Sequence, residues 1–127
     1  MLQLIPSNLF VLEMANNHMG SVTHGLEVIR QFGAVCRKYP EFAFAFKFQY
    51  RDLDTFVHPS MRGRLDVKYI KRFEETRLSR QQFDELVAEC RKQGFLSMAT
   101  PFDNASVEII DAQDLDIIKI ASCSFTD

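Results

Sequence analysis

The sequence predicts an α/β fold on a parallel sheet, either an open doubly wound sheet or part of a (β/α)8 barrel. Four short apolar runs alternate with longer segments whose apolar residues recur at helical spacing. A strand, a helix and a further strand form a right-handed crossover that leaves the two strands parallel. No G-x-G-x-x-G motif follows the first apolar run, so a dinucleotide-binding fold is disfavoured.

The first predicted unit is a strand over residues 9–15, LFVLEMA, followed by a turn-like NNHMGS and a helix. Ser21 is a suitable cap for this helix, and Pro40 stops it. The stripe expected to face the core consists of Val22, Leu26, Ile29, Phe32 and Cys36.

The second predicted strand lies in FAFAFKFQY, residues 42–50, where phenylalanine occupies every second position. Alternate side chains of a strand face opposite ways, so we expect the four phenylalanines to share a helix-covered face. The other face then carries Ala43, Ala45, Lys47 and Gln49. In a barrel this second face points inward, and its polar end reaches the mouth where barrel enzymes place their chemistry.

The remaining elements continue the alternation. Residues 51–65 are predicted to be a long polar connection, and residues 67–73 a short helix. The next helix should start with a capping box of Ser79 and Gln82 and end near Gly94. The third strand is expected over residues 95–102 and the fourth over residues 115–122. Between them we expect a helix capped by Asp103 or Asn104, with Val107 and Ile110 inward.

Composition narrows the class of protein. A net charge of −2 gives no reason to expect a nucleic-acid partner. Three cysteines without paired spacing predict neither a disulfide framework nor a zinc site, and fit a cytoplasmic location. The amino-terminal sequence resembles neither a signal peptide nor a transmembrane span, so no membrane partner is expected.

Polar side chains follow the apolar runs near their carboxyl ends. These residues are Glu13, Lys47, Gln49, Thr100, Lys119 and Ser122. Burying a charge without a partner is costly, so several such groups on apolar strands favour a binding site over a purely structural sheet. Two lysines and two hydroxyls suit a phosphate or a carboxylate, and Glu13 is a candidate base or hydroxyl acceptor.

Four segments resemble, in order, the sialic acid synthase (N-acetylneuraminate synthase) family. They are EMANNHMGS, KFQY, the long segment ending in ATPFD, and IIKIAS, and the resemblance covers the chain from about Phe10 onward. Two positions depart from the usual pattern. Ala99 replaces a serine, and Cys123 replaces a glycine.

The resemblance implies a (β/α)8 barrel that condenses phosphoenolpyruvate with an N-acetylmannosamine-type sugar. The product would be a nine-carbon 2-keto sugar acid, released together with phosphate. A divalent metal, Mn or Mg, is expected in the complete enzyme. Its ligands are expected outside this chain, and a homo-oligomer is expected.

Carried over by motif, Lys47, Thr100, Lys119 and Ser122 match phosphoenolpyruvate-binding positions. Gln49 is expected to contact substrate, and Glu13 matches an active-site glutamate near the sugar. Asn17 and His18 match the loop motif that follows. As alternatives, Asn17 could hold a tight turn and His18 could brace the loop.

A complete (β/α)8 barrel needs roughly 250 residues. We therefore expect residues 1–127 to be the first four β/α units, without the second half of the barrel and without the carboxyl-terminal antifreeze-like domain. Alone, the chain is expected to lack full activity. Two alternatives stay open: a related synthase of legionaminic or pseudaminic acid, and a non-catalytic binding or assembly module derived from a barrel.

Overall fold

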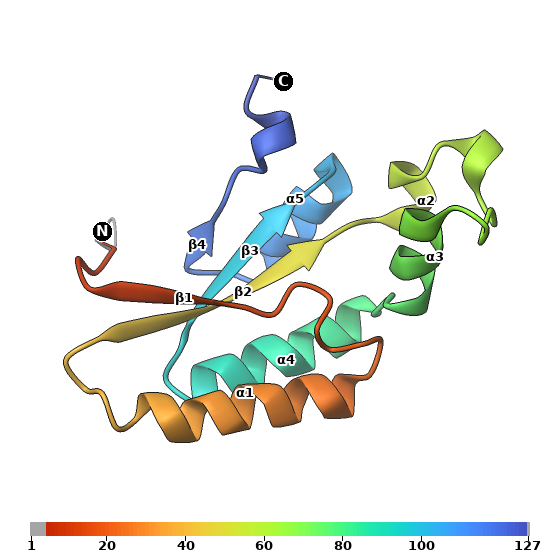
Figure 1. The fold of residues 1–127 in the computed structure, drawn as a ribbon. Helices are drawn as coiled ribbons and strands as arrows, with labels where there is room; N and C mark the ends of the chain where they lie inside the picture. Colours follow the sequence, from red (N-terminus) through yellow and green to blue (C-terminus); the bar gives the residue numbers. More distant parts are fainter. Residues whose placement is uncertain (1–4, 127) are drawn as a thin grey trace.

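A computed structural model describes residues 5–126 as a single four-stranded parallel sheet flanked by helices (Figure 1). The strands follow one another across the sheet in sequence order: β1 (Leu9–Glu13), β2 (Ala43–Tyr50), β3 (Leu96–Pro101) and β4 (Ile117–Ile118). Each neighbouring pair is parallel. The predicted α/β class and parallel sheet are therefore confirmed.

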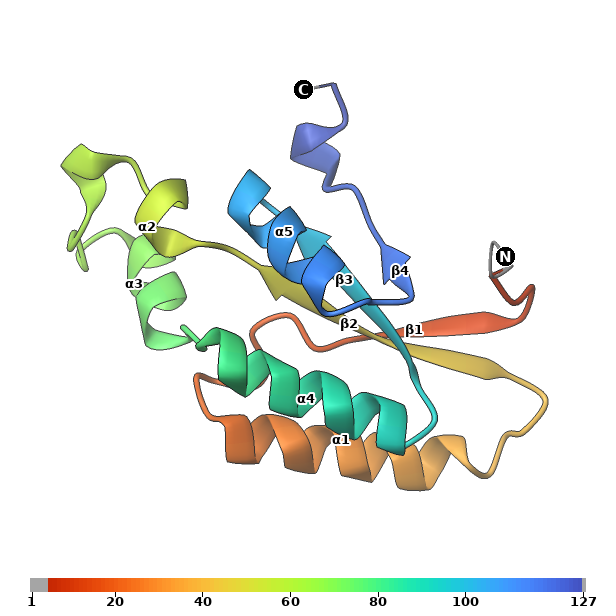
Figure 2. The same cartoon turned by 180° about the vertical axis from the view of Figure 1, so that it is seen from behind.

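Helices α1 (Val22–Cys36) and α4 (Arg80–Lys92) lie side by side against one face of the sheet (Figures 1 and 2). Helix α5 (Asn104–Ala112) packs against β3. The short helices α2 (Leu53–Phe56) and α3 (Lys68–Glu75) project beyond the end of β2. In the described part of the chain, no helix is both long enough and apolar enough to cross a membrane.

Helix α1 begins as predicted, because the Ser21 hydroxyl accepts a hydrogen bond from the His24 amide at 3.2 Å. Its buried positions are Gly25, Ile29 and Gly33. A side chain at Gly25 would place its Cβ 2.8 Å from the Leu86 side chain, so glycine is what lets α1 approach α4 closely. Phe32, predicted to be inward, contacts Phe46 with one edge but keeps 44% of its surface exposed.

Helix α4 carries both predicted end signals. Ser79 and Gln82 form the reciprocal capping box, with hydrogen bonds of 3.2 and 2.8 Å. Gly94 follows the helix with a φ of +83°, the left-handed conformation that commonly ends a helix. The two ends of α4 are thus determined by local sequence.

The main core lies between the sheet and helices α1 and α4. From β2 it receives Phe46, Phe48 and Tyr50, which are at most 2% exposed. The Tyr50 hydroxyl donates to the Gln113 side chain at 2.8 Å, which satisfies its polar end. Phe42 is different, because it precedes the strand and is 39% exposed. The prediction of a helix-covered face was right for the later phenylalanines and wrong for Phe42.

The connection after β2 is more ordered than predicted. Residues 51–65 were expected to be a polar loop, but they hold α2 and a 3-10 turn at Pro59–Met61. A second small core of Leu53, Val57 and Ile70 joins α2 to α3. Three apolar side chains spread over eighteen positions gave no local periodicity, so the sequence signal was too weak to reveal this core.

Two predictions near the carboxyl terminus were wrong. The fourth strand was expected over residues 115–122, but β4 pairs with β3 at only two residues, and Ser122–Ser124 forms a 3-10 turn. β1 is also an outermost strand but pairs with β2 at five positions, so the apolar sequence of β4 and its outer place do not by themselves set the length of the ladder. Val107 is 44% exposed, whereas Ile110 is buried as predicted. Helix α5 covers the sheet along a narrower stripe than expected.

Candidate functional site

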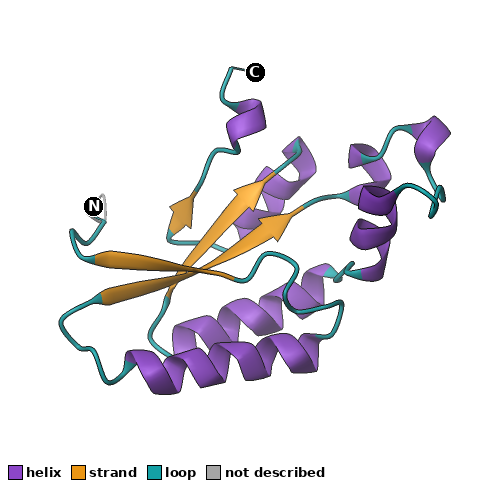
Figure 3. Cartoon of the chain, viewed as in Figure 1, coloured by secondary structure: helices purple, strands orange, loops and turns teal. Residues whose placement is uncertain are grey.

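The carboxyl ends of β2 and β3 point to the same side of the molecule, toward α2 and α3 (Figure 3). Register brings the predicted polar residues into two pairs across neighbouring strands. Glu13 lies opposite Lys47, and Gln49 lies opposite Thr100. Four of the eight predicted site residues are therefore neighbours because of strand pairing alone.

Glu13 and Lys47 form an ion pair, with 2.5 Å between the carboxylate and the ammonium. The Lys47 side chain is 15% exposed, whereas that of Glu13 is 43% exposed. The lysine is therefore the more deeply placed partner, on the sheet face opposite the phenylalanine core. Such a pair can exchange its internal partner for a ligand, because an incoming anion could take the place of the carboxylate beside the ammonium.

Gln49 and Thr100 differ in exposure. Thr100 is 3% exposed, while Gln49 is half-buried, and its side-chain oxygen accepts from the Arg51 guanidinium at 3.1 Å. Gln49 also lines a small cavity beneath α3. The amide is thus held by a neighbouring cation and borders open space, an arrangement suited to recognising a polar ligand.

Lys119 and Ser122 make less contact with the other predicted site residues. The backbone N–H of Lys119 donates to the Ala99 carbonyl at 2.9 Å, which places this residue beside Thr100. Ser122 is exposed at the start of a 3-10 turn. Within residues 5–126, no side-chain hydrogen bond or ion pair links either of them to the other predicted site residues.

The loop after β1 holds the other two predicted residues. The Asn17 amide donates to the Glu13 carbonyl at 3.3 Å, and Asn17 itself is exposed. His18 is 1% exposed, and its Nδ1 accepts from the Gly20 amide at 3.1 Å. Its ring also meets Phe83 edge to face. In this arrangement Asn17 closes the turn and His18 braces the loop, while His18 also borders the cavity that Gln49 lines.

Burial fixes the protonation state of His18. Loss of hydration lowers its pKa to about 4, with a smaller contribution from the charge of His24. A neutral ring at neutral pH agrees with Nδ1 acting as a hydrogen-bond acceptor. His18 is therefore a neutral hydrogen-bond acceptor in the described chain, and its contact with a substrate stays a prediction.

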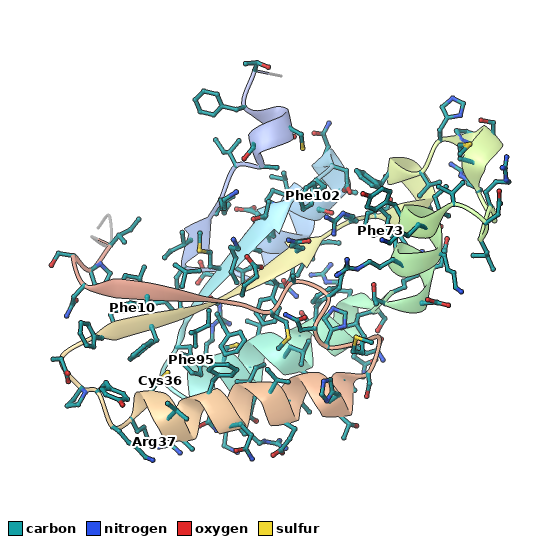
Figure 4. The ribbon with its side chains drawn as sticks, in the orientation of Figure 1. Phe10, Cys36, Arg37, Phe73, Phe95 and Phe102 are labelled. Atoms are coloured by element: carbon teal, nitrogen blue, oxygen red, sulfur yellow. The ribbon has the colours of Figure 1, made fainter. Side chains whose placement is uncertain are left out.

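Arg51 lies beside the predicted site residue Gln49, and the sequence interpretation did not include it. It continues the two-residue alternation of Lys47 and Gln49 past the end of β2, so it falls on the same polar face. The pattern could have been extended by one step to find it. Its guanidinium carbon lies 3.8 Å from the ring centre of Phe102 and 4.6 Å from that of Phe73. Both rings lie at the end of the molecule where β2 and β3 finish (Figure 4).

The described residues do not offer a metal site of their own. No group of three or more histidine, cysteine, aspartate or glutamate side chains converges anywhere in residues 5–126. Glu13, the one carboxylate among the predicted site residues, is engaged with Lys47. These residues do not by themselves fit a resident divalent metal.

Solved structures share this fold. A protein of Chromobacterium violaceum described as spore coat polysaccharide biosynthesis protein E is 57% identical over 95% of this chain, with a TM-score of 0.90. The N-acetylneuraminic acid (sialic acid) synthetase of Leptospira borgpetersenii, solved with citrate, is 25% identical over 94% of the chain, with a TM-score of 0.68. A spore coat polysaccharide biosynthesis protein of Bacillus subtilis has the same fold at 19% identity, over 92% of the chain, with a TM-score of 0.61.

The chain is shorter than all of these relatives. It spans 36%, 37% and 30% of the three solved chains. An uncharacterised protein of Methanocaldococcus jannaschii is 28% identical over 91% of this chain, which spans 31% of its length. The chain thus corresponds to about a third of each relative.

A protein-family model also matches the chain. The model described as the NeuB family matches residues 42–127, from the strand that carries Lys47 and Gln49 to the end of the chain. This match covers more than half of the sequence and includes three of the four strands. The resemblance expected from the sequence motifs is confirmed, and the chain belongs to the NeuB family.

Proposed function

We propose that this chain forms the phosphoenolpyruvate-binding part of a sialic acid synthase-like enzyme. The observation that carries the proposal is the Glu13–Lys47 ion pair, at the carboxyl end of the sheet, where Gln49 and Thr100 also lie. Membership of the NeuB family and the likeness to a sialic acid synthetase support it. A cytoplasmic location and a homo-oligomeric state are part of the same proposal.

The proposed reaction joins phosphoenolpyruvate to the open-chain aldehyde of an N-acetylmannosamine-type sugar. The alkene carbon attacks the aldehyde carbon, a carbon–carbon bond forms, and the aldehyde oxygen takes up a proton. Water adds to the resulting oxocarbenium carbon and loses a proton. The bond from that carbon to the phosphate oxygen then breaks while the new hydroxyl gives up its proton, which leaves a 2-keto sugar acid and inorganic phosphate.

Each residue has a defined part in this proposal. Lys47 and Lys119 would neutralise the carboxylate and phosphate of phosphoenolpyruvate, with Thr100 and Ser122 donating hydroxyl hydrogen bonds. Glu13 would accept a proton or a sugar hydroxyl hydrogen bond. The Mn or Mg expected for the complete enzyme is given no ligand in this chain.

A related acceptor is the second candidate. The relative with 57% identity carries a spore coat polysaccharide description, which favours a product built into a surface polysaccharide, such as legionaminic or pseudaminic acid. The same anion site would serve these reactions, because phosphoenolpyruvate is common to them. A non-catalytic module is the alternative from a different class, and the short span relative to its relatives is the observation in its favour.

Calorimetric titration of the full chain with phosphoenolpyruvate tests the proposal. Saturable binding is expected, and Lys47→Met should weaken it at least about tenfold, as expected when a charge-assisted hydrogen bond is lost. Lys38→Met, which removes an exposed lysine beyond α1, is the matched control and should bind normally. Absence of saturable binding would contradict a phosphoenolpyruvate site in this chain and would favour the non-catalytic module.

A further inference from the structure

Three aromatic rings surround the guanidinium of Arg51, just beyond the end of β2. Its guanidinium lies against Phe102 and Phe73, and the ring centre of Phe56 is 5.9 Å away. Cation–π contacts of this kind fix the plane of the guanidinium and limit the rotamers of a long side chain. An arginine fixed before a ligand arrives loses little further entropy on binding.

The hydrogen-bonding capacity of this guanidinium is largely unused. Its Nη2 donates to Gln49, while its Nε is buried and has no partner among the described residues. Asp103 is the carboxylate near it, but the two Asp103 oxygens already accept from the amides of Asp52 and Ser106. Buried donors are normally satisfied, so Arg51 is under-satisfied within the described residues, and an anion beside its guanidinium would improve its surroundings.

The space beside Arg51 is a cavity bordered by a second cation. The cavity lies between the loop after β1, the end of β2 and the helix α3, and its lining residues include Asn16, Gln49, Arg51, Tyr69, Arg72 and Phe73. Arg72 makes no ion pair within residues 5–126, whereas Arg77 nearby is paired with Asp54 and Glu74.

Two cations at one cavity oppose each other when no anion is present. Burial lowers the pKa of Arg51, Asp103 and Cys123 raise it, and the charge of Arg72 makes the smallest contribution, which lowers it; arginine stays protonated throughout. A bound anion would relieve this repulsion and would fill the free positions of the arginine fork. The amides of Asn16 and Gln49 can donate to the same anion.

This cavity is separate from the proposed phosphoenolpyruvate site. Arg51 follows Lys47 by four residues, which at the strand rise corresponds to roughly 13 Å along β2. Gln49 lies between them on the same face. A ligand that contacts Gln49 would therefore have Lys47 toward one end and Arg51 toward the other.

We propose that Arg51 and Arg72 bind an anionic substituent, a carboxylate or a phosphate monoester, on the sugar acceptor at the end remote from its aldehyde. This inference rests on the proposed function for the identity of the acceptor. It assigns Arg51 as a specificity-determining residue, selecting acidic sugars over neutral ones.

Three probes test the proposal in calorimetric titrations of the full chain: N-acetylmannosamine, its 6-phosphate and the matching uronic acid. At least one acidic sugar should bind about tenfold or more tightly than the neutral sugar, since charge-assisted hydrogen bonds are the stronger class. The 6-phosphate and the uronic acid distinguish a phosphate site from a carboxylate site.

Variants assign the effect to the cavity. Arg51→Gln and Arg72→Gln should each reduce the preference for the acidic sugar, and Arg51→Lys should restore it in part, because it keeps the charge but loses the fork. Arg72 is exposed on α3, so its variant tests the site even if Arg51→Gln fails to fold. Arg37→Gln, at the opposite end of the molecule (Figure 4), is the charge-matched control and should change nothing.

Three results would overturn the inference. They are equal binding of neutral and acidic sugars, no binding of any of the three, and competition between phosphoenolpyruvate and the acidic sugar. Competition would mean that the cavity holds phosphoenolpyruvate itself. The phosphoenolpyruvate titration with Lys47→Met separately reports failure of the proposed function.

Discussion

The two faces of strand β2 have different tasks although their residues alternate along one stretch of chain. Phe46, Phe48 and Tyr50 are buried beneath α1 and α4, whereas Lys47 and Gln49 lie half-buried on the opposite face. The side chains of the first face pack against other residues of the chain. The second face carries the Glu13–Lys47 ion pair and borders cavities, so its polar groups are available to a ligand. One strand can thus separate stability from binding by side-chain alternation.

Removing a packed ring should have the largest effect. Phe48→Ala takes away a fully buried side chain, and we expect the free energy of unfolding to fall by about 3–5 kcal/mol. Urea unfolding followed by circular dichroism measures this. Phe125→Ala is the control, because that ring is 79% exposed and its loss should change stability by less than about 0.5 kcal/mol. Equal effects would mean that the covered face is not the stabilising one.

The buried His18 should make the free energy of unfolding depend on pH. Because its pKa is about 4 in the folded chain and near 6.5 when unfolded, the unfolded state binds more protons between these values. Its contribution to stability is therefore complete above pH 6.5 and is lost as pH falls toward 4. The loss is at most about 3 kcal/mol.

The His18→Gln variant should show a weaker decline of stability between pH 6.5 and 4 than the unmodified chain. Urea unfolding at several pH values measures this difference. His24→Gln, at an exposed position, should keep most of the decline. If both variants follow the unmodified chain, His18 is not the group responsible.

Variants of Glu13 and Lys47 separate the roles of these two residues on the polar face of β2. Glu13→Gln should bind phosphoenolpyruvate at least as tightly as the unmodified chain, because it removes the carboxylate that competes with the ligand for Lys47. Lys47→Met should instead lose at least about tenfold. Calorimetry of the two variants in parallel measures the contrast. A large loss in Glu13→Gln would assign the glutamate to phosphoenolpyruvate binding.

The smallest effect is expected at the start of α4, which covers the packed face. Ser79→Ala removes the hydroxyl that accepts from the Gln82 amide and should cost about 1 kcal/mol of unfolding free energy. Thermal or urea unfolding measures it. Phosphoenolpyruvate affinity should not change, and Ser7→Ala, at an exposed position, serves as the control. A loss of affinity would show that the two faces are coupled.

Features decided by neighbouring residues could be predicted from the sequence. The capping residues Ser21, Ser79 and Asp103 all act as expected, because a cap depends on a side chain and an amide two or three positions away. The parallel sheet followed from the alternation of strands and helices. Glu13 and Lys47 were both predicted from late positions in apolar strands, and strand register made them partners.

Features that depend on distant neighbours were decided by the tertiary structure. The apolar sequence of the fourth strand forms only two paired residues although β3 continues to Pro101, so the path of the chain and not its apolar character sets the length of β4. Phe32 and Val107 have the right spacing for a buried face, yet burial depends on what covers them. Arg51 meets Phe73 and Phe102 from two other elements, and no local pattern contains that encounter. The sequence by itself thus determined the elements, their order and the polar face of β2, since these follow from short-range geometry. The aromatic setting of Arg51 and the cavity beside it required the packed chain, since they arise from residues far apart in sequence.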